Sequence, residues 1–85
     1  MIKITYIFAD DWCGIYVNND LVIENHSIDF VYGMKFIAKY ISDNGIEVNQ
    51  FTFEKYEIDQ EWLEDMSNLP DDFSDIPTDI LTEIK

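Results

Sequence analysis

Apolar side chains alternate with their neighbours at the start of the chain, where Ile2, Ile4, Tyr6 and Phe8 fall on one side of an extended segment. A period of two predicts a β-strand that is buried mainly on that side. This segment constrains the fold more than any other feature, because a one-sided strand must be completed by other strands and by a cover over its apolar face.

Two short apolar runs, residues 14–17 and 21–24, follow a loop and are separated by Asn18-Asn19-Asp20. Residues that tolerate a positive φ between two such runs predict a tight hairpin. Residues 46–56 predict a further strand, with Phe51 and Phe53 on one side of it. The expected sheet is antiparallel and has about four strands.

One long helix is expected from an N-cap at Ser27 to about Asp43, with Asn44-Gly45 as its C-terminal cap. Helical spacing predicts that one side of it faces the sheet. That side contains Phe30, Val31, Met34, Ile37, Ala38 and Ile41. Gly33 costs about 1 kcal/mol inside a helix relative to Ala.

The last third of the chain predicts a short acidic helix from Asp59 to Ser67, ended by Leu69-Pro70, and then an ordered tail with a helical turn from Thr78. The predicted fold class is therefore α+β, in a single domain of residues 1–85. The expected contributors to its core are Phe8, Trp12, Met34, Ile37, Phe51, Phe53 and Trp62.

The chain is strongly acidic, with 18 Asp plus Glu against 5 Lys plus Arg and a formal net charge of -13. Residues 54–85 carry 11 acids and 2 lysines, a net of -9, whereas residues 1–53 carry 7 acids and 3 lysines, a net of -4. Direct nucleic-acid binding is not expected, because it depends on clustered Lys and Arg. No apolar run approaches the ~20 residues of a membrane span, and a lone cysteine fits a reducing cytoplasm.

The acidic residues after position 56 are the first candidate site. The carboxylates predicted to bind a partner are Glu57, Glu61, Glu64, Asp65, Asp71, Asp72, Asp75 and Asp79. Residues four apart on a helix lie ~6 Å apart along its axis, close to the spacing of phosphates in a nucleic-acid strand. The alternative is a solvated face that keeps the protein soluble.

Aromatic residues are the second candidate, and the predicted apolar anchors are Tyr32, Phe36 and Phe73. Tyr32 and Phe36 lie four apart on the side of the long helix that faces away from the expected core, and an outward aromatic pair favours an interface. The alternative is that the C-terminal tail covers the back of this helix.

Cys13 and His26 are the only candidates for a catalytic pair. A two-residue turn at Asn19-Asp20 would place them opposite each other in the hairpin. A thiol nucleophile also needs an orienting group and an oxyanion hole, and no motif supplies these, so structural packing is the preferred interpretation. One His and one Cys do not make a metal site, and the isolated glycines form no phosphate-binding loop, so no cofactor is expected.

Two groups of short motifs complete the sequence. The first is Asp11-Trp12-x-Gly14-x-Tyr16, with Leu21-Val22 and His26-Ser27, and the second is Glu61-Trp62-Leu63-Glu64, with Leu69-Pro70-Asp71. These motifs resemble a group of small acidic proteins of low-GC bacteria and their phages, which has no assigned activity. The resemblance implies a lineage and a cytoplasmic location. In size and charge the chain is also similar to phage inhibitors that mimic DNA, including the uracil-DNA glycosylase inhibitors.

The sequence thus favours a non-enzymatic binding protein of phage or mobile-element type, which inhibits a basic host protein that handles nucleic acid. Carboxylates would replace phosphates, and an aromatic side chain would anchor the contact. Two alternatives stay open: an immunity protein that neutralises a toxin, and a housekeeping or small-ligand-binding domain with a pocket near Trp12, Cys13 and His26. A homodimer formed through the Tyr32 side of the helix also stays open.

Overall fold

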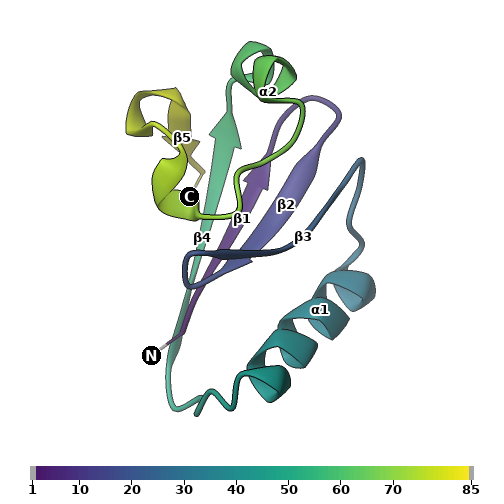
Figure 1. Ribbon diagram of the computed structural model, residues 1–85, viewed down its shortest axis with the longest axis vertical. Coiled ribbons are helices and arrows are strands. Elements are labelled where there is room, and N and C mark those ends of the chain that lie inside the picture. Colours follow the sequence, from purple (N-terminus) through teal and green to yellow (C-terminus); the bar gives the residue numbers. More distant parts are fainter. Residues whose placement is uncertain (1, 85) are drawn as a thin grey trace.

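The computed structural model describes residues 2–84, which form a five-stranded sheet, two α-helices and two 3₁₀ turns (Figure 1). The strands are β1 (Ile2–Phe8), β2 (Cys13–Val17), β3 (Asp20–Asn25), β4 (Phe51–Ile58) and β5 (Leu81–Glu83). The helices are α1 (Phe30–Asp43) and α2 (Gln60–Met66), and the 3₁₀ turns are η1 (Phe73–Asp75) and η2 (Thr78–Ile80). The predicted α+β class is confirmed.

The strand order is β3-β2-β1-β4-β5, and the sheet is mixed. Neighbouring strands are antiparallel except for β1 and β4, which are parallel. The expectation of an antiparallel sheet of about four strands is therefore wrong in its finer detail. The reason is the path of the chain. Two hairpins make β3 parallel to β1, and α1 then carries the chain back to the end of the sheet where β1 begins. β4 therefore starts at that end and runs parallel to β1.

The hairpin between β2 and β3 forms as predicted, but in a different register. Val17 pairs with Asp20, so Asn18 and Asn19 make the turn, and Asn18 has a φ of 57°. A bulge at Ile15/Tyr16 then shifts the pairing, and Cys13 lies opposite Asn25. The expected pairing of Cys13 with His26 is thus wrong, because it assumed a turn one residue later and an unbroken ladder.

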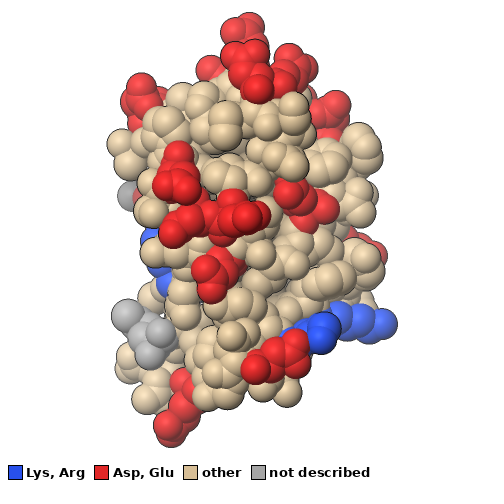
Figure 2. Space-filling model, viewed as in Figure 1, with Lys and Arg blue, Asp and Glu red and all other residues tan. Residues whose placement is uncertain are grey.

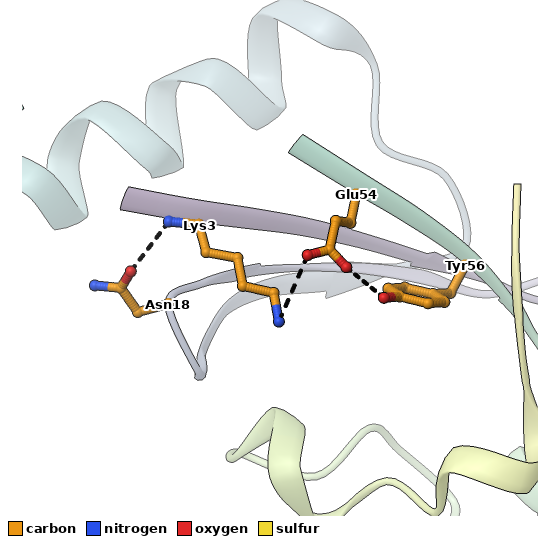
Figure 3. Close-up of polar contacts among 4 residues, drawn as sticks. All are labelled: Lys3, Asn18, Glu54 and Tyr56. Atoms are coloured by element: carbon orange, nitrogen blue, oxygen red, sulfur yellow. Dashed lines mark hydrogen bonds and ion pairs between the residues drawn. The ribbon is translucent and has the colours of Figure 1, made fainter. Parts of the chain in front are cut away.

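The sheet is covered by α1 on one face and by residues 67–80 on the other (Figure 3). Side chains of successive strand residues point to opposite faces, so each cover has its own core. The core under α1 contains Ile2, Ile4, Ile15, Val17, Ile23 and Ile37. The core under the C-terminal residues contains Ile7, Tyr16, Ile58, Leu63, Leu69 and Ile76.

The N-cap of α1 is Asp29, whose side chain accepts a hydrogen bond from the backbone N–H of Tyr32 at 2.8 Å, and it is not Ser27. The predicted C-terminal cap is confirmed, since Gly45 has a φ of 59°. The predicted buried side is largely wrong. The residues of that side that the structure exposes are Phe30, Val31, Met34 and Ala38.

Gly33 explains which side of α1 faces the sheet. A Cβ atom at this position would lie 3.0 Å from Ile15 Cδ1 and 3.1 Å from Ile28 Cγ2, so the helix comes closest to the sheet here. The buried side is therefore centred on Gly33 and Ile37. It is completed by Phe36, Tyr40 and Ile41, which are partly buried.

Three of the expected core residues are exposed. Phe51 and Phe53 have 65% and 63% of their surface accessible, and Met34 has 46%. The cause is the position of α1, which packs over β2 and β3 and buries Ile2 and Ile4 of β1 but leaves the same face of β4 uncovered. Phe8, Trp12 and Trp62 are half-buried, while Ile37 is buried as predicted.

The C-terminal part follows its prediction more closely. Asp59 caps α2 by accepting a hydrogen bond from the N–H of Glu61 at 2.9 Å, and Ser67 ends the helix with a φ of 72°. The expected turn at Thr78 is present as η2. Strand β5 was not predicted, because three residues are too few to show a period.

Candidate functional site

Negative charge is concentrated in one stretch of the chain. Residues 56–84 contain ten acidic residues and no Lys or Arg. They are Glu57, Asp59, Glu61, Glu64, Asp65, Asp71, Asp72, Asp75, Asp79 and Glu83. Figure 2 shows acidic side chains gathered over the end of the molecule that holds α2 and over the C-terminal residues, while lysines appear only at the left margin and at the lower right, beside α1. We call these ten residues the acidic surface.

Helix α2 carries the first group of these carboxylates, Glu61, Glu64 and Asp65, all exposed. No basic residue lies in its last turn. Carboxylates spaced three and four residues apart repel each other, and those near a helix C-terminus oppose its dipole. Glu64 and Asp65 therefore destabilise α2, so stability does not explain their presence.

A surface hollow of about 380 Å³ contains the second group. Glu57 at the end of β4, Asp59 at the cap of α2 and Asp79 in η2 all line it. Acidic residues from three different elements thus line one hollow, which the sequence alone does not indicate.

The third group surrounds Tyr16. Burial first, and then the negative charges of Glu24, Asp71, Asp72 and Asp75, raise the pKa of the Tyr16 hydroxyl well above its usual range. Asp72 also accepts hydrogen bonds from the N–H and hydroxyl of Ser74, which lower the pKa of its carboxyl group. The three aspartates lie on η1 and the loop before it, so their regular spacing in sequence is not displayed on a helix.

Of the described lysines, Lys3 lies nearest the acidic surface, whereas Lys35, Lys39 and Lys55 lie on α1 or on its side of the sheet. The Nζ of Lys3 lies 3.7 Å from Oε1 of Glu54 (Figure 3). It also lies over the ring of Phe73. Lys55 lies over the rings of Tyr6 and Phe8 on the α1 side of the sheet. Residues 28–47, which include α1, hold 3 acids and 2 lysines, a net of -1, against -10 for residues 56–84. The two sides of the molecule therefore differ sharply in charge.

The structure does not bring the three predicted anchors together. Tyr32 and Phe36 form an edge-to-face pair at 5.0 Å on α1, across the sheet from the C-terminal residues. Phe73 lies among the acidic residues but packs against Tyr16 at 5.4 Å and Tyr56 at 5.9 Å. It belongs to the core there and is half-buried.

Met66 is an apolar side chain that does share a surface with the carboxylates. It is 46% exposed and follows Asp65 at the end of α2. It lies four residues after the half-buried Trp62, and the orientation of α2 is what distinguishes the exposed residue from the half-buried one.

Within the described residues, Cys13 and His26 make hydrogen bonds to other groups and not to each other. Cys13 is buried, and its Sγ donates a hydrogen bond of 3.4 Å to the carbonyl of Asn25. His26 is exposed and packs edge-on against Trp12 at 4.8 Å. The indole Nε1 of Trp12 donates to Glu24 Oε1 at 2.9 Å, and the same carboxylate oxygen accepts from the N–H of Leu69. These contacts attach the loop before β2 to the C-terminal residues.

Within residues 2–84, no three Asp, Glu, His or Cys side chains are close enough to hold a metal ion. Neither of the two described helices is long and apolar enough to cross a membrane.

No protein-family model, curated protein or solved structure matches the chain. The acidic surface is the candidate functional site. Its carboxylates can attract and contact a positively charged macromolecule, and such complementarity raises association rate and selectivity more than affinity.

Proposed function

We propose that this protein is a non-enzymatic acidic binding protein that inhibits a basic, nucleic-acid-handling protein by covering its positively charged surface. One observation carries the proposal: residues 56–84 supply ten carboxylates and no cation to one side and one end of the fold. A partner that normally contacts phosphates would meet these negative charges instead.

The local structure supports this use of the carboxylates. Glu64 and Asp65 oppose the dipole of α2, and most of the other carboxylates are exposed and make no ion pair within residues 2–84. A surface kept for solubility alone would be served equally well by charges spread over both sides of the molecule. We further propose that Met66 supplies apolar contact beside Asp65, while Tyr32 and Phe36 lie too far around the fold to take part in the same contact.

The anti-defence role of a phage or mobile-element protein is the biological setting that this proposal favours. An inhibitor of this kind needs no active site, only a surface that competes with nucleic acid. The partner would be a host protein with a basic groove or cleft, and the competition would be direct.

A pair of charge-matched variants tests the proposal. Asp71→Asn/Asp75→Asn and Asp43→Asn/Glu47→Gln each change the net charge from -13 to -11, but the first pair lies on the acidic surface and the second beside α1. Neither Asp71 nor Asp75 caps a helix or makes a side-chain hydrogen bond within the described residues, so folding should be retained.

The immobilised wild-type protein is first used to capture host proteins at low salt, and each captured protein is purified and titrated. Binding should weaken steeply as salt is added, duplex DNA should compete for the partner, and the Asp71/Asp75 variant should lose affinity while the Asp43/Glu47 variant keeps it. Equal affinity at low and high salt, or equal losses in the two variants, would contradict the proposal.

A further inference from the structure

One edge of the sheet is only partly closed. β1 pairs with β4 from Phe51 to Glu57, but on its other side β4 pairs with β5 only from Tyr56 to Ile58. No strand within residues 2–84 pairs with Phe51–Glu54 on that outer side (Figure 1). The first half of β4 is therefore a free edge.

Two hydrogen bonds show in which direction the backbone N–H and C=O groups of this edge point. The carbonyl of Gln50 accepts from the N–H of Ile2 at 2.8 Å, and the carbonyl of Lys55 accepts from the N–H of Ile84 at 2.8 Å. Alternate residues of a strand direct their N–H and C=O groups to opposite neighbours. Even-numbered residues of β4 thus face β1, and the backbone groups of Phe51 and Phe53 point outward from the free edge.

Among the described residues, nothing guards residues 48–53 of this edge against pairing. Natural edges are guarded by lysines, prolines, bulges or a covering segment. Residues 48–53 (Val-Asn-Gln-Phe-Thr-Phe) contain no charge and no proline, in a chain with 18 acidic and 5 basic residues. The side chains of Phe51 and Phe53 are also exposed, on the face that α1 leaves uncovered.

We propose that this edge pairs with the same edge of a second copy of the chain, in antiparallel orientation about a two-fold axis at Thr52. Phe51 then faces Phe53 of the partner subunit as a hydrogen-bonded pair, and the two Thr52 residues face each other as a non-hydrogen-bonded pair. The two five-stranded sheets become one continuous sheet. This inference does not use the acidic surface and stands independently of the proposed function.

This register brings the phenylalanine residues of the two copies together. Four phenylalanine side chains, two from each copy, gather on one face, and cross-strand aromatic pairs stabilise a sheet. A hollow of about 510 Å³ lies beside the free edge where β5 ends, lined by Phe53, Glu54, Lys55, Glu83 and Ile84. It leaves room for side chains of the incoming strand.

The charge distribution favours a second copy in this orientation. Two chains of net charge -13 repel each other, so they can approach only where the charge is low, and the uncharged residues 48–53 provide that place. β4 leads into α2, so antiparallel pairing directs the two α2 ends away from each other. The longest axis of each copy is 36 Å, several times the screening length of about 8 Å in physiological salt.

Sedimentation equilibrium over a micromolar concentration range tests the pairing. The wild-type protein should show a reversible monomer–dimer equilibrium, and Phe51→Lys should weaken it at least ~10-fold, because an edge lysine is a natural block to strand pairing. Phe30→Lys is the matched control: it makes the same change at an exposed residue of α1 and should leave the equilibrium unchanged. A wild-type protein that stays monomeric, or a dimer that Phe30→Lys dissociates and Phe51→Lys does not, overturns the proposal.

A disulfide at the two-fold axis gives a second, independent measurement. Non-hydrogen-bonded residues of an antiparallel pair have Cα atoms about 4.5 Å apart, which a disulfide can span. Thr52→Cys should therefore form a covalent dimer on mild oxidation, whereas Thr82→Cys, an exposed residue of β5, should not. The wild-type protein is the control for any disulfide formed through the buried Cys13. Equal rates of dimer formation for Thr52→Cys and Thr82→Cys would contradict the assigned register.

Discussion

Tyr16, a fully buried residue of β2, donates a hydrogen bond of 2.7 Å from its hydroxyl group to the backbone carbonyl of Pro70. This bond joins the middle of the sheet to the beginning of the segment that carries Asp71, Asp72 and Asp75. The core residue Tyr16 thus fixes where three carboxylates of the acidic surface lie, and the fold and the candidate site are connected through it.

Removing this hydroxyl should loosen the segment without unfolding the sheet. Tyr16→Phe keeps the ring that packs against Phe73 but leaves the carbonyl of Pro70 without its partner, so we expect a loss of about 1 kcal/mol in the free energy of unfolding. Urea unfolding measures the loss, and hydrogen exchange should show faster exchange in residues 71–76 than in α1. Tyr32→Phe, at an exposed position, is the control, and equal stability of both variants would show that the Tyr16 bond contributes nothing.

Gly14 allows the segment to approach β2 closely. A Cβ atom at this position would lie only 2.3 Å from Leu69 Cδ1, so the leucine side chain would have to move. We expect Gly14→Ala to destabilise the protein by about 1–3 kcal/mol through overpacking. In the double variant Gly14→Ala/Leu69→Ala the two effects should be less than additive in urea unfolding, because the clash is absent. Strict additivity would argue against this contact.

The orientation of α1 could have been predicted from the residues that form its buried side. Gly33, Phe36, Ile37, Tyr40 and Ile41 repeat with the three-and-four spacing of a helix face. Apolar residues on the remaining sides of this helix obscure the pattern, since Phe30, Val31 and Met34 are as apolar as those that are buried. Gly33 costs the helix stability, and a close approach to a strand is the explanation that the sequence suggests; in the structure the helix does lie close to Ile15 of β2 at this residue.

The acidic surface shows what sequence can and cannot supply. The charge asymmetry between the two parts of the chain is a property of the sequence, and so are the capping positions Asp59 and Gly45. That Glu57, Asp59 and Asp79 line the same hollow depends on tertiary structure. So does the packing of Phe73 into the core, because no local pattern tells a buried aromatic residue from an exposed one.

Stability should fall in alkaline solution, between about pH 10 and pH 12. A hydrogen bond to Glu54, then burial, raises the pKa of Tyr56 from 10.0 to about 12. Burial, and then the neighbouring Cys13, raises the pKa of Tyr6 to about 12. The unfolded chain therefore loses these protons first, so their contribution is complete below pH 10 and is lost as the pH rises towards 12.

Urea unfolding at a series of pH values measures this decline. Tyr56→Phe removes one of the titrating groups and should make the decline shallower. The variant should also be less stable than the wild type at neutral pH, because it lacks the hydrogen bond to Glu54. If the wild-type protein and Tyr56→Phe lose stability with the same slope above pH 10, the hydroxyl of Tyr56 is not responsible.

Thr5 is the clearest site for a stabilising substitution. It is fully buried in β1, and its Oγ1 has no hydrogen-bond partner among the described residues. Valine has nearly the same shape and favours strands, so Thr5→Val removes an unsatisfied polar atom without creating a cavity. We expect a gain of about 1 kcal/mol in the free energy of unfolding, seen as a higher urea midpoint with an unchanged m-value. Thr82→Val, at an exposed position, should give no such gain. A Thr5→Val protein less stable than the wild type would mean that the hydroxyl is satisfied by a buried water molecule, and that β1 holds a polar site inside its core.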